Sequence, residues 1–351
     1  MNLPGGVASY YNTLQLDRYD NITYFIVNSS KKETKIATFG RLFFNYWLFF
    51  YKVVRNRYKL IHLNPSLEKR SFYRDSLFII ISKILKRKTL VFFRGWLEEY
   101  EKEIKKSKIK RIIFKFSYAK ADKFIVLSEL FKKKLIELGV SSEKEFFIET
   151  TVADTTYLNE FDLEKKFLSY EDKINFLFLS RIVKTKGIYI AIDAYRYFLQ
   201  KFPCRKSALT IAGDGPELRS AKRYVNELKI PNINFTGYIS GDDKKKFLHE
   251  SHILLFPSYT EGLPNTILEG MLYGMPVISR DTGGIPDIIK QNINGFLTKS
   301  LQPEVFTDFL SILTTDNKLY RKIATTNHQI ALNKFTREIV RERILEIYET
   351  F

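Results

Sequence analysis

Short runs of β-branched and aromatic residues alternate with longer helical stretches along this chain of 351 residues. The runs lack a strict apolar–polar alternation, so we expect parallel strands that are buried on both faces of a sheet. The pattern predicts an α/β protein with two doubly wound, Rossmann-like domains. The expected strands are residues 22–27, 59–63, 89–93, 123–128, 173–180, 208–213, 233–237, 253–257 and 275–279.

The length of the chain also favours two domains over one. We expect the first domain at 1–160 and the second at 172–334, with a linker around 158–171. A last segment, 335–351, has apolar residues at helical spacing and is expected to pack back on the first domain.

The start of the chain departs from the doubly wound pattern. Such a domain opens with a strand that precedes its glycine loop, whereas "PGGV" here begins at residue 4. We therefore expect the first strand of the N-terminal domain to be missing. Truncation is the favoured explanation, and a re-assigned starting methionine or a dispensable strand are the alternatives.

The formal net charge of +18 is unevenly distributed. Residues 1–155 hold 30 Lys and Arg against 16 Asp and Glu, whereas the remaining residues hold 27 against 23. This asymmetry predicts an anionic partner for the first half. A biased codon usage is the alternative, but it would affect both halves alike. No nucleic-acid reader motif occurs, so nucleic acid is not the expected partner.

Cysteine content and the N-terminal sequence bear on the compartment. The single cysteine, Cys204, excludes an internal disulfide framework and fits a reducing compartment. The first residues show neither the basic nor the apolar region of a signal peptide. A cytoplasmic protein is therefore expected.

Two cations follow one of the predicted strands. In "SRIVKTKG", Arg181 comes at the end of the strand and Lys186 follows five residues later. Ligands of open α/β sheets bind outside the carboxyl ends of strands, and this pair suits a diphosphate. Gly213, in "TIAGDGPE", would allow a close backbone approach at the same edge. Solvated side chains and an ordinary tight turn are the alternatives.

The most specific stretch is "FPSYTEGLPNTILEGMLYGMPVIS", residues 256–279. Glu261 follows a predicted strand, and a helix is expected to start near Pro264 or Asn265. The free N–H groups of a helix start bind phosphate, and carboxylates accept hydrogen bonds from sugar hydroxyls. Glu269 lies two turns into this helix. Taken singly, both glutamates could be ordinary surface charges.

These motifs, in the order "SRIVKTKG", "AGDGPEL", "EGLPNTILEG" and "TGGIPDIIKQNINGFL", resemble those of family-4 retaining glycosyltransferases with the GT-B fold. The resemblance covers about residues 173–300, and "PGGVASY" extends it loosely into the first half. It implies two Rossmann-like domains that face each other across a cleft. It also implies a UDP- or GDP-linked sugar as the donor, with no other cofactor.

The resemblance assigns a role to each matched residue. Arg181 and Lys186 would hold the diphosphate, Glu269 the ribose hydroxyls, and Glu261 the hydroxyls of the donor sugar. Further donor contacts would come from the closing loop at Gly5 and Gly6, from Gly213, from the base-side residues Tyr238 and Ile239, and from the backbone of Leu263, Pro264 and Asn265.

The implied reaction retains the anomeric configuration and uses no metal. No Asp-x-Asp occurs, and the four histidines show no metal-ligand spacing. One position departs from the family pattern, because many relatives carry a histidine where "FFRGW" has Arg94. Arginine cannot act as a base at neutral pH, but it could bind an anionic acceptor or donor.

Residues 101–123 hold nine Lys and Arg against three acids, with Ile109, Ile112, Ile113 and Phe116 as an apolar stripe. Such a helix suits an anionic membrane surface, and a solvated helix face is the alternative. The run 41–52 is expected to be core. A glycan or lipid-linked oligosaccharide is the expected acceptor, at the inner face of the membrane, in lipopolysaccharide or capsule biosynthesis.

Three rival functions remain open. A decayed, non-catalytic GT-B protein could bind membranes or glycans through its basic half. A glycan phosphorylase or a sucrose-type synthase could use the same fold.

Overall fold

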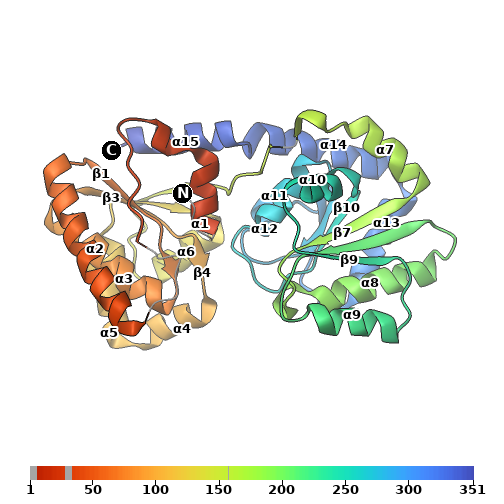
Figure 1. The fold of residues 1–351 in the computed structure, drawn as a ribbon, viewed down its shortest axis with the longest axis horizontal. Helices are drawn as coiled ribbons and strands as arrows, with labels where there is room; N and C mark the ends of the chain where they lie inside the picture. The colour runs from red at the N-terminus through yellow and green to blue at the C-terminus, as the bar shows by residue number, and fades with distance from the viewer. Residues whose placement is uncertain (1–5, 28–33, 157) are drawn as a thin grey trace. The chain divides into compact units, whose positions relative to one another are not determined.

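The computed structural model describes residues 6–27, 34–156 and 158–351. They form two compact units (Figure 1). The first unit consists of the residues up to Thr150 together with Val340–Phe351. The second unit is Thr151–Ile339. Residues 151–160, which we expected in the first domain, therefore belong to the second unit.

The first unit contains a four-stranded parallel sheet in the order β1-β3-β5-β6. Three of its helices begin with a side-chain cap. The side chains of Thr34, Ser107 and Ser128 each accept a hydrogen bond from a backbone N–H of the first helical turn. The elements are α1 (Gly6–Leu14), η1 (Leu16–Arg18), α2 (Lys35–Asn56), β1 (Leu60–Leu63), β2 (Ser66–Leu67), α3 (Lys69–Ile84), β3 (Lys88–Phe92), β4 (Gly95–Trp96), α4 (Glu98–Lys106), α5 (Lys108–Phe116), η2 (Tyr118–Lys120), β5 (Lys123–Val126), α6 (Glu129–Glu137) and β6 (Glu145–Ile148).

Helix α15 (Arg337–Glu349) returns the chain to the first unit. Tyr348 hydrogen-bonds the partly buried His62 at 2.7 Å, and Arg343 forms an ion pair with Glu149 at 2.8 Å. Burial lowers the pKa of His62 to about 3, so the ring is neutral at this contact. The last helix thus packs on β1 and on the end of β6.

The strand expected at 22–27 is absent from the described structure. In a doubly wound sheet the second strand pairs with the first, and the described residues contain no strand before β1. Phe25 packs instead against Phe49 and Phe78, at 5.5 and 6.1 Å between ring centroids. The segment is held by this side-chain packing and by side-chain hydrogen bonds, such as that of Asn45 to the Val27 carbonyl, rather than by a neighbouring strand.

Helix α2 corrects a second expectation, because the run 41–52 is only partly core. Phe49 and Val53 are buried, whereas Phe43, Phe44 and Trp47 are exposed. The helix is apolar on nearly every side, and only one side can face the rest of the unit. None of the described helices is both long and apolar enough to cross a membrane.

The second unit contains a six-stranded parallel sheet in the order β12-β11-β10-β7-β8-β9. Its elements are η3 (Leu158–Glu160), α7 (Leu163–Asp172), β7 (Ile174–Leu179), η4 (Lys184–Lys186), α8 (Ile188–Lys201), β8 (Ser207–Ala212), α9 (Leu218–Glu227), β9 (Ile233–Gly237), α10 (Gly241–Glu250), β10 (Ile253–Phe256), α11 (Asn265–Leu272), β11 (Val277–Arg280), α12 (Ile285–Ile288), β12 (Gly295–Thr298), α13 (Pro303–Thr315) and α14 (Asn317–Lys334).

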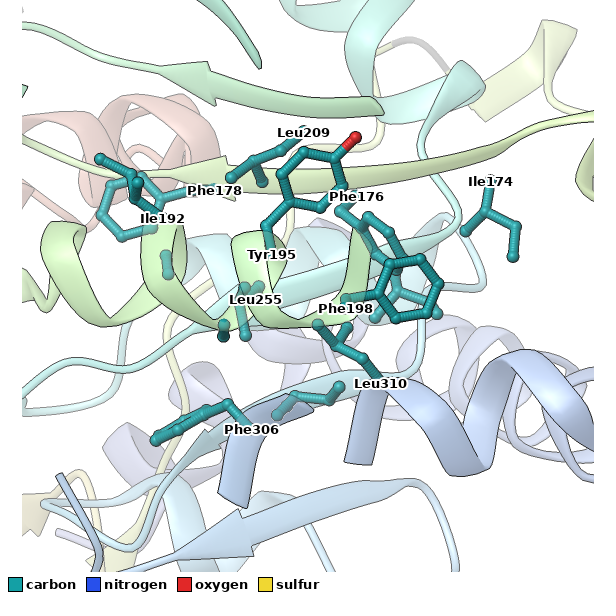
Figure 2. Close-up of a cluster of buried hydrophobic side chains, with 14 of the residues drawn as sticks. Ile174, Phe176, Phe178, Ile192, Tyr195, Phe198, Leu209, Leu255, Phe306 and Leu310 are labelled. Atoms are coloured by element: carbon teal, nitrogen blue, oxygen red, sulfur yellow. The ribbon is translucent and has the colours of Figure 1, made fainter. Parts of the chain in front are cut away.

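The core of this unit lies between the sheet and helices α8 and α13 (Figure 2). Phe198 of α8 packs edge-on against Phe176 of β7, with ring centroids 5.1 Å apart. Phe306 and Leu310 of α13 are fully buried in the same cluster. This packing fixes the central strands, whose carboxyl ends carry the predicted site residues.

The stretch that we expected to be a linker forms helix α7 instead. Asp162 caps its start by accepting the N–H groups of Glu164 and Lys165. Phe167 and Tyr170 are buried in the core. Lys166 is also buried, and its ammonium group donates to three backbone carbonyls, those of Leu248, Ser251 and Tyr273, at 3.0, 2.6 and 2.6 Å.

The Lys166 ammonium therefore ties the end of α10 to the end of α11. Replacing Lys166 by Met should lower the free energy of unfolding by at least about 2 kcal/mol, because buried carbonyls lose their donors. The neighbouring Lys165→Met is the matched control, since the Lys165 side chain is 84% exposed. Its effect should stay within about 0.5 kcal/mol in urea denaturation. Equal losses in the two variants would contradict this role.

Candidate functional site

The site predicted from the sequence lies at the point where the strand order of the second unit reverses. β7 and β10 are neighbours in the middle of the sheet. The chain continues from β7 to β8 on one side and from β10 to β11 on the other. The loops after β7 and β10 therefore diverge, and in open α/β sheets ligands bind at the carboxyl edge of such a reversal.

The loops after β7 and β10 bring Lys186 and Glu261 into contact. Lys186 Nζ donates a hydrogen bond to Glu261 Oε1 and forms an ion pair with it. The Glu261 side chain is nearly buried, at 8% exposure, and that of Lys186 is partly exposed, at 25%. The two loops are also fastened by the Tyr259 N–H, which donates to the Thr185 carbonyl at 2.8 Å.

Glycines allow the neighbouring loops to approach this pair. Gly283 has φ +60°, and a Cβ there would lie 2.0 Å from the backbone oxygen of Glu261. Gly213 has φ +144°, and a Cβ there would lie 1.9 Å from the backbone oxygen of Ser180. Gly213 therefore packs the loop after β8 against the start of the Arg181 loop, while Gly283 supports the Glu261 loop.

Helix α11 carries the second glutamate. The helix starts at Asn265 with Pro264 as its N-cap and has no side-chain cap, which leaves its first N–H groups available for a ligand. Leu263, just before it, is buried. Glu269 is buried too, and Lys244 of α10 donates to its Oε1 at 2.7 Å. Burial raises the pKa of Glu269, although the Lys244 ammonium acts to lower it.

Sequence reasoning missed Lys244 and Lys166. Lys244 is the first of three successive lysines on α10, and its sequence context does not distinguish it from the others. Lys166 carried a usable signal, because it adjoins the apolar positions Phe167 and Tyr170 at helical spacing. Lys244 becomes visible only when the contacts between helices are known.

The other predicted donor residues have different surroundings. The Arg181 side chain is exposed and has no partner among the residues that the structure describes. Tyr238, after β9, is 79% exposed, whereas Ile239 is buried. Gly6 is the first residue of α1, and Gly5 lies outside the described residues.

Arg94 belongs to the first unit and follows β3. Its guanidinium carbon lies 3.9 Å from the ring centroid of Tyr10 and 4.6 Å from that of Phe92. Within the described ranges its buried Nε and Nη1 have no hydrogen-bond partner. Burial lowers the pKa of Arg94. Tyr10 lies on α1, so the helix that begins at Gly6 reaches this guanidinium.

Across the described ranges, no three His, Cys, Asp or Glu side chains gather where they could hold a metal ion. The residues placed at the site supply cations, carboxylates and helix N–H groups. These groups suit an anionic, hydroxyl-rich ligand.

Comparisons with known proteins find similarity to glycosyltransferases. Residues 159–329 match the family model of glycosyl transferases group 1. The chain is 29% identical over 269 residues to an uncharacterized glycosyltransferase of Methanocaldococcus jannaschii, covering 70% of this chain and 64% of that protein. It is 24% identical over 281 residues to the amylovoran biosynthesis glycosyltransferase AmsK of Erwinia amylovora, covering 76% and 65%. The matches thus span just under two thirds of these curated relatives.

The fold has solved counterparts as well. The structure of Anabaena HepE in complex with UDP superimposes with a TM-score of 0.68 at 18% identity, covering 86% of this chain and 82% of HepE. The fold is therefore GT-B. Residues 159–329 of this fold are similar to glycosyl transferases group 1.

Proposed function

We propose that this protein is a retaining glycosyltransferase that moves a sugar from a UDP- or GDP-linked donor to a glycan or lipid-linked acceptor. The observation that carries the proposal is the meeting of Lys186, Glu261 and the α11 N-terminus at the strand-order reversal. HepE, which shares the fold, has been solved with UDP and with UDP-glucose. AmsK is named for the biosynthesis of amylovoran.

The hard step of such a transfer is expulsion of the nucleoside diphosphate, which develops negative charge on the leaving oxygen. Preorganised cations and N–H groups stabilise that charge in the transition state. Arg181, Lys186 and the start of α11 would supply them, so the proposed reaction needs no metal ion. The acceptor hydroxyl would attack from the side of the leaving group, and no residue is assigned as a covalent nucleophile.

The ion pair between Lys186 and Glu261 changes how the two residues are expected to act. Glu261 cancels much of the Lys186 charge, so attraction of the diphosphate would depend strongly on Arg181 and the helix start. Removing Lys186 alone would leave a nearly buried, unpaired carboxylate beside the phosphates. This penalty adds to the loss of the cation itself.

We therefore expect Arg181→Ala and Lys186→Ala each to lower kcat/KM for the donor by about a hundredfold or more. The double variant Lys186→Ala/Glu261→Gln should bind nucleoside diphosphate more tightly than Lys186→Ala alone, because the repelling charge is gone. Titration calorimetry with UDP and GDP measures this difference. If the double variant binds no better than Lys186→Ala, the pair does not set the charge at the site.

Glu269 and Glu261 should differ in the step that they affect. Glu261 would contact the reacting sugar, so Glu261→Gln should lower kcat more than nucleotide affinity. Glu269 would hold the ribose in ground and transition states alike, so Glu269→Gln should mainly weaken binding. Equal losses of nucleotide affinity in both variants would contradict this division.

The raised pKa of Glu269 adds a pH dependence. The ribose contact needs the carboxylate, so nucleotide affinity should be full at high pH and fall as pH drops through this raised pKa. The loss should begin at a higher pH than for an ordinary carboxyl, whose pKa is about 4.3. Glu269→Gln should abolish this acid limb. An identical limb in wild type and variant would assign it to another group.

Arg94 is the proposed contact for an anionic group of the acceptor. Its two unpartnered buried donors each lose hydrogen bonding on folding, and a phosphate oxygen would satisfy them. The stacking on Tyr10 and Phe92 holds the guanidinium plane in place. An acceptor linked to lipid through phosphate offers such an anion. We propose that it binds here while the enzyme works at the inner face of the membrane.

Pyrophosphate is a simple probe of this contact. In an Arg181→Ala/Lys186→Ala background, which disables the donor clamp, the remaining affinity for pyrophosphate should fall at least about tenfold on Arg94→Gln. The control is Arg18→Gln, which removes an exposed arginine of the same unit. Unchanged affinity in Arg94→Gln would remove Arg94 from acceptor binding.

A further inference from the structure

Helix α2 presents an unusually apolar face to solvent. Ile36, Phe39 and Phe43 are 85%, 75% and 70% exposed. At 3.6 residues per turn, the exposed residues fall within an arc of about 140° that runs the length of the helix. These residues form what we call the α2 face: Ile36, Phe39, Phe43, Phe44, Trp47, Phe50, Tyr51 and Val54.

The α2 face is not the side on which the helix packs. Phe49 and Val53, on another side, are buried, and Phe49 contacts Phe78 of α3 at 5.0 Å between ring centroids. The α2 face therefore adds little to the core of the unit. A large exposed apolar patch on a protein surface marks an interaction site.

Neighbouring helices also expose apolar side chains. α3, which packs against α2, exposes Tyr73, Leu77 and Ile84. α5, which packs against α3, exposes Ile109, Ile112 and Phe116. Figure 1 shows α2, α3 and α5 in the same part of the first unit. Three helices packed in series thus each expose apolar side chains to solvent.

The charge on these helices identifies the chemistry of the partner. α2 contains four basic residues and no acidic one. On α5 and beside it, Lys106, Lys108 and Lys115 are exposed and have no ion-pair partner within the described part of the chain, whereas Lys105 and Lys110 are paired with glutamates. The first unit holds 32 Lys and Arg against 18 Asp and Glu. A partner that complements these side chains would have an anionic outer layer above an apolar interior.

We infer that the α2 face inserts into the interface of an anionic phospholipid bilayer, with the unpaired lysines of the α5 region on the headgroups. Helices with Trp and Phe on one side and Lys and Arg beside them lie in the membrane plane in this way. Over 22 residues α2 spans about 33 Å, so it offers an extended contact surface. The inference deepens the proposed location at a membrane, but it requires neither donor binding nor transfer.

The test is co-sedimentation of the full chain with vesicles of phosphatidylglycerol and phosphatidylcholine in equal parts. Partitioning should fall at least about tenfold in Phe39→Ser/Phe43→Ser/Trp47→Ser. The matched control replaces three exposed apolar residues of the second unit, Leu168, Ile293 and Leu301, by Ser and should bind as wild type does. Circular dichroism and UDP affinity should be unchanged in both variants.

A charge series tests the lysines separately. Lys106→Gln/Lys108→Gln/Lys115→Gln should weaken binding, and the dependence on salt should be smaller than in wild type. The control, Lys173→Gln/Lys229→Gln/Lys318→Gln, removes as many exposed lysines from the second unit. Pure phosphatidylcholine vesicles should bind the wild type much less. Equal partitioning onto both kinds of vesicle would overturn the inference.

Fluorescence reports insertion directly. The chain has two tryptophans, and Trp96→Phe leaves Trp47 as the single emitter. Its emission should shift to shorter wavelength on the anionic vesicles and be quenched by brominated acyl chains. If instead the wild type forms a dimer without lipid, the triple serine variant is monomeric and vesicles leave Trp47 unchanged, the α2 face joins two copies and the inference is wrong.

Discussion

The second unit contains two buried or nearly buried carboxylates, and each of them needs a cationic partner. Glu261 and Glu269 would be costly as isolated charges, so each is paired with a lysine from another loop or helix. Lys186 reaches Glu261 across the reversal of strand order, and Lys244 reaches Glu269 from α10. Arg181 is exposed in the same loop after β7 that carries Lys186. We propose that these groups bind the hydroxyls and phosphates of one donor.

The surrounding structure keeps these pairs in register. Gly283 lets the loop after β11 lie against the backbone of Glu261, and the Lys166 ammonium joins the ends of α10 and α11. The first unit has different features. It contains the Arg94 guanidinium, whose buried Nε and Nη1 have no hydrogen-bond partner among the described residues, and the helix α2 with its exposed apolar face. These two sets of features motivate the proposal that one unit binds the donor and the other an anionic, membrane-linked acceptor.

The sequence predicted most of this architecture from local pattern. Parallel strands buried on both faces appear in the sequence as apolar runs, and Pro264 located the start of α11. Residues 22–27 also read as a strand, but a strand forms only beside a neighbour, and no local pattern reports that neighbour. The prediction that the run 41–52 is core was wrong for a related reason. When apolar residues lie on all sides of a helix, the sequence does not indicate which side the rest of the fold covers.

The central claim is that the carboxyl edge of the second unit binds a nucleoside diphosphate. Thermal unfolding with UDP and GDP tests it most directly, in wild type and in the double variant Arg181→Ala/Glu269→Gln. A ligand that binds the native state at a hundred times its Kd stabilises it by about 2.7 kcal/mol. We predict a rise in Tm with at least one nucleotide in the wild type and none in the variant. No rise with either nucleotide, or equal rises in both proteins, would contradict the account.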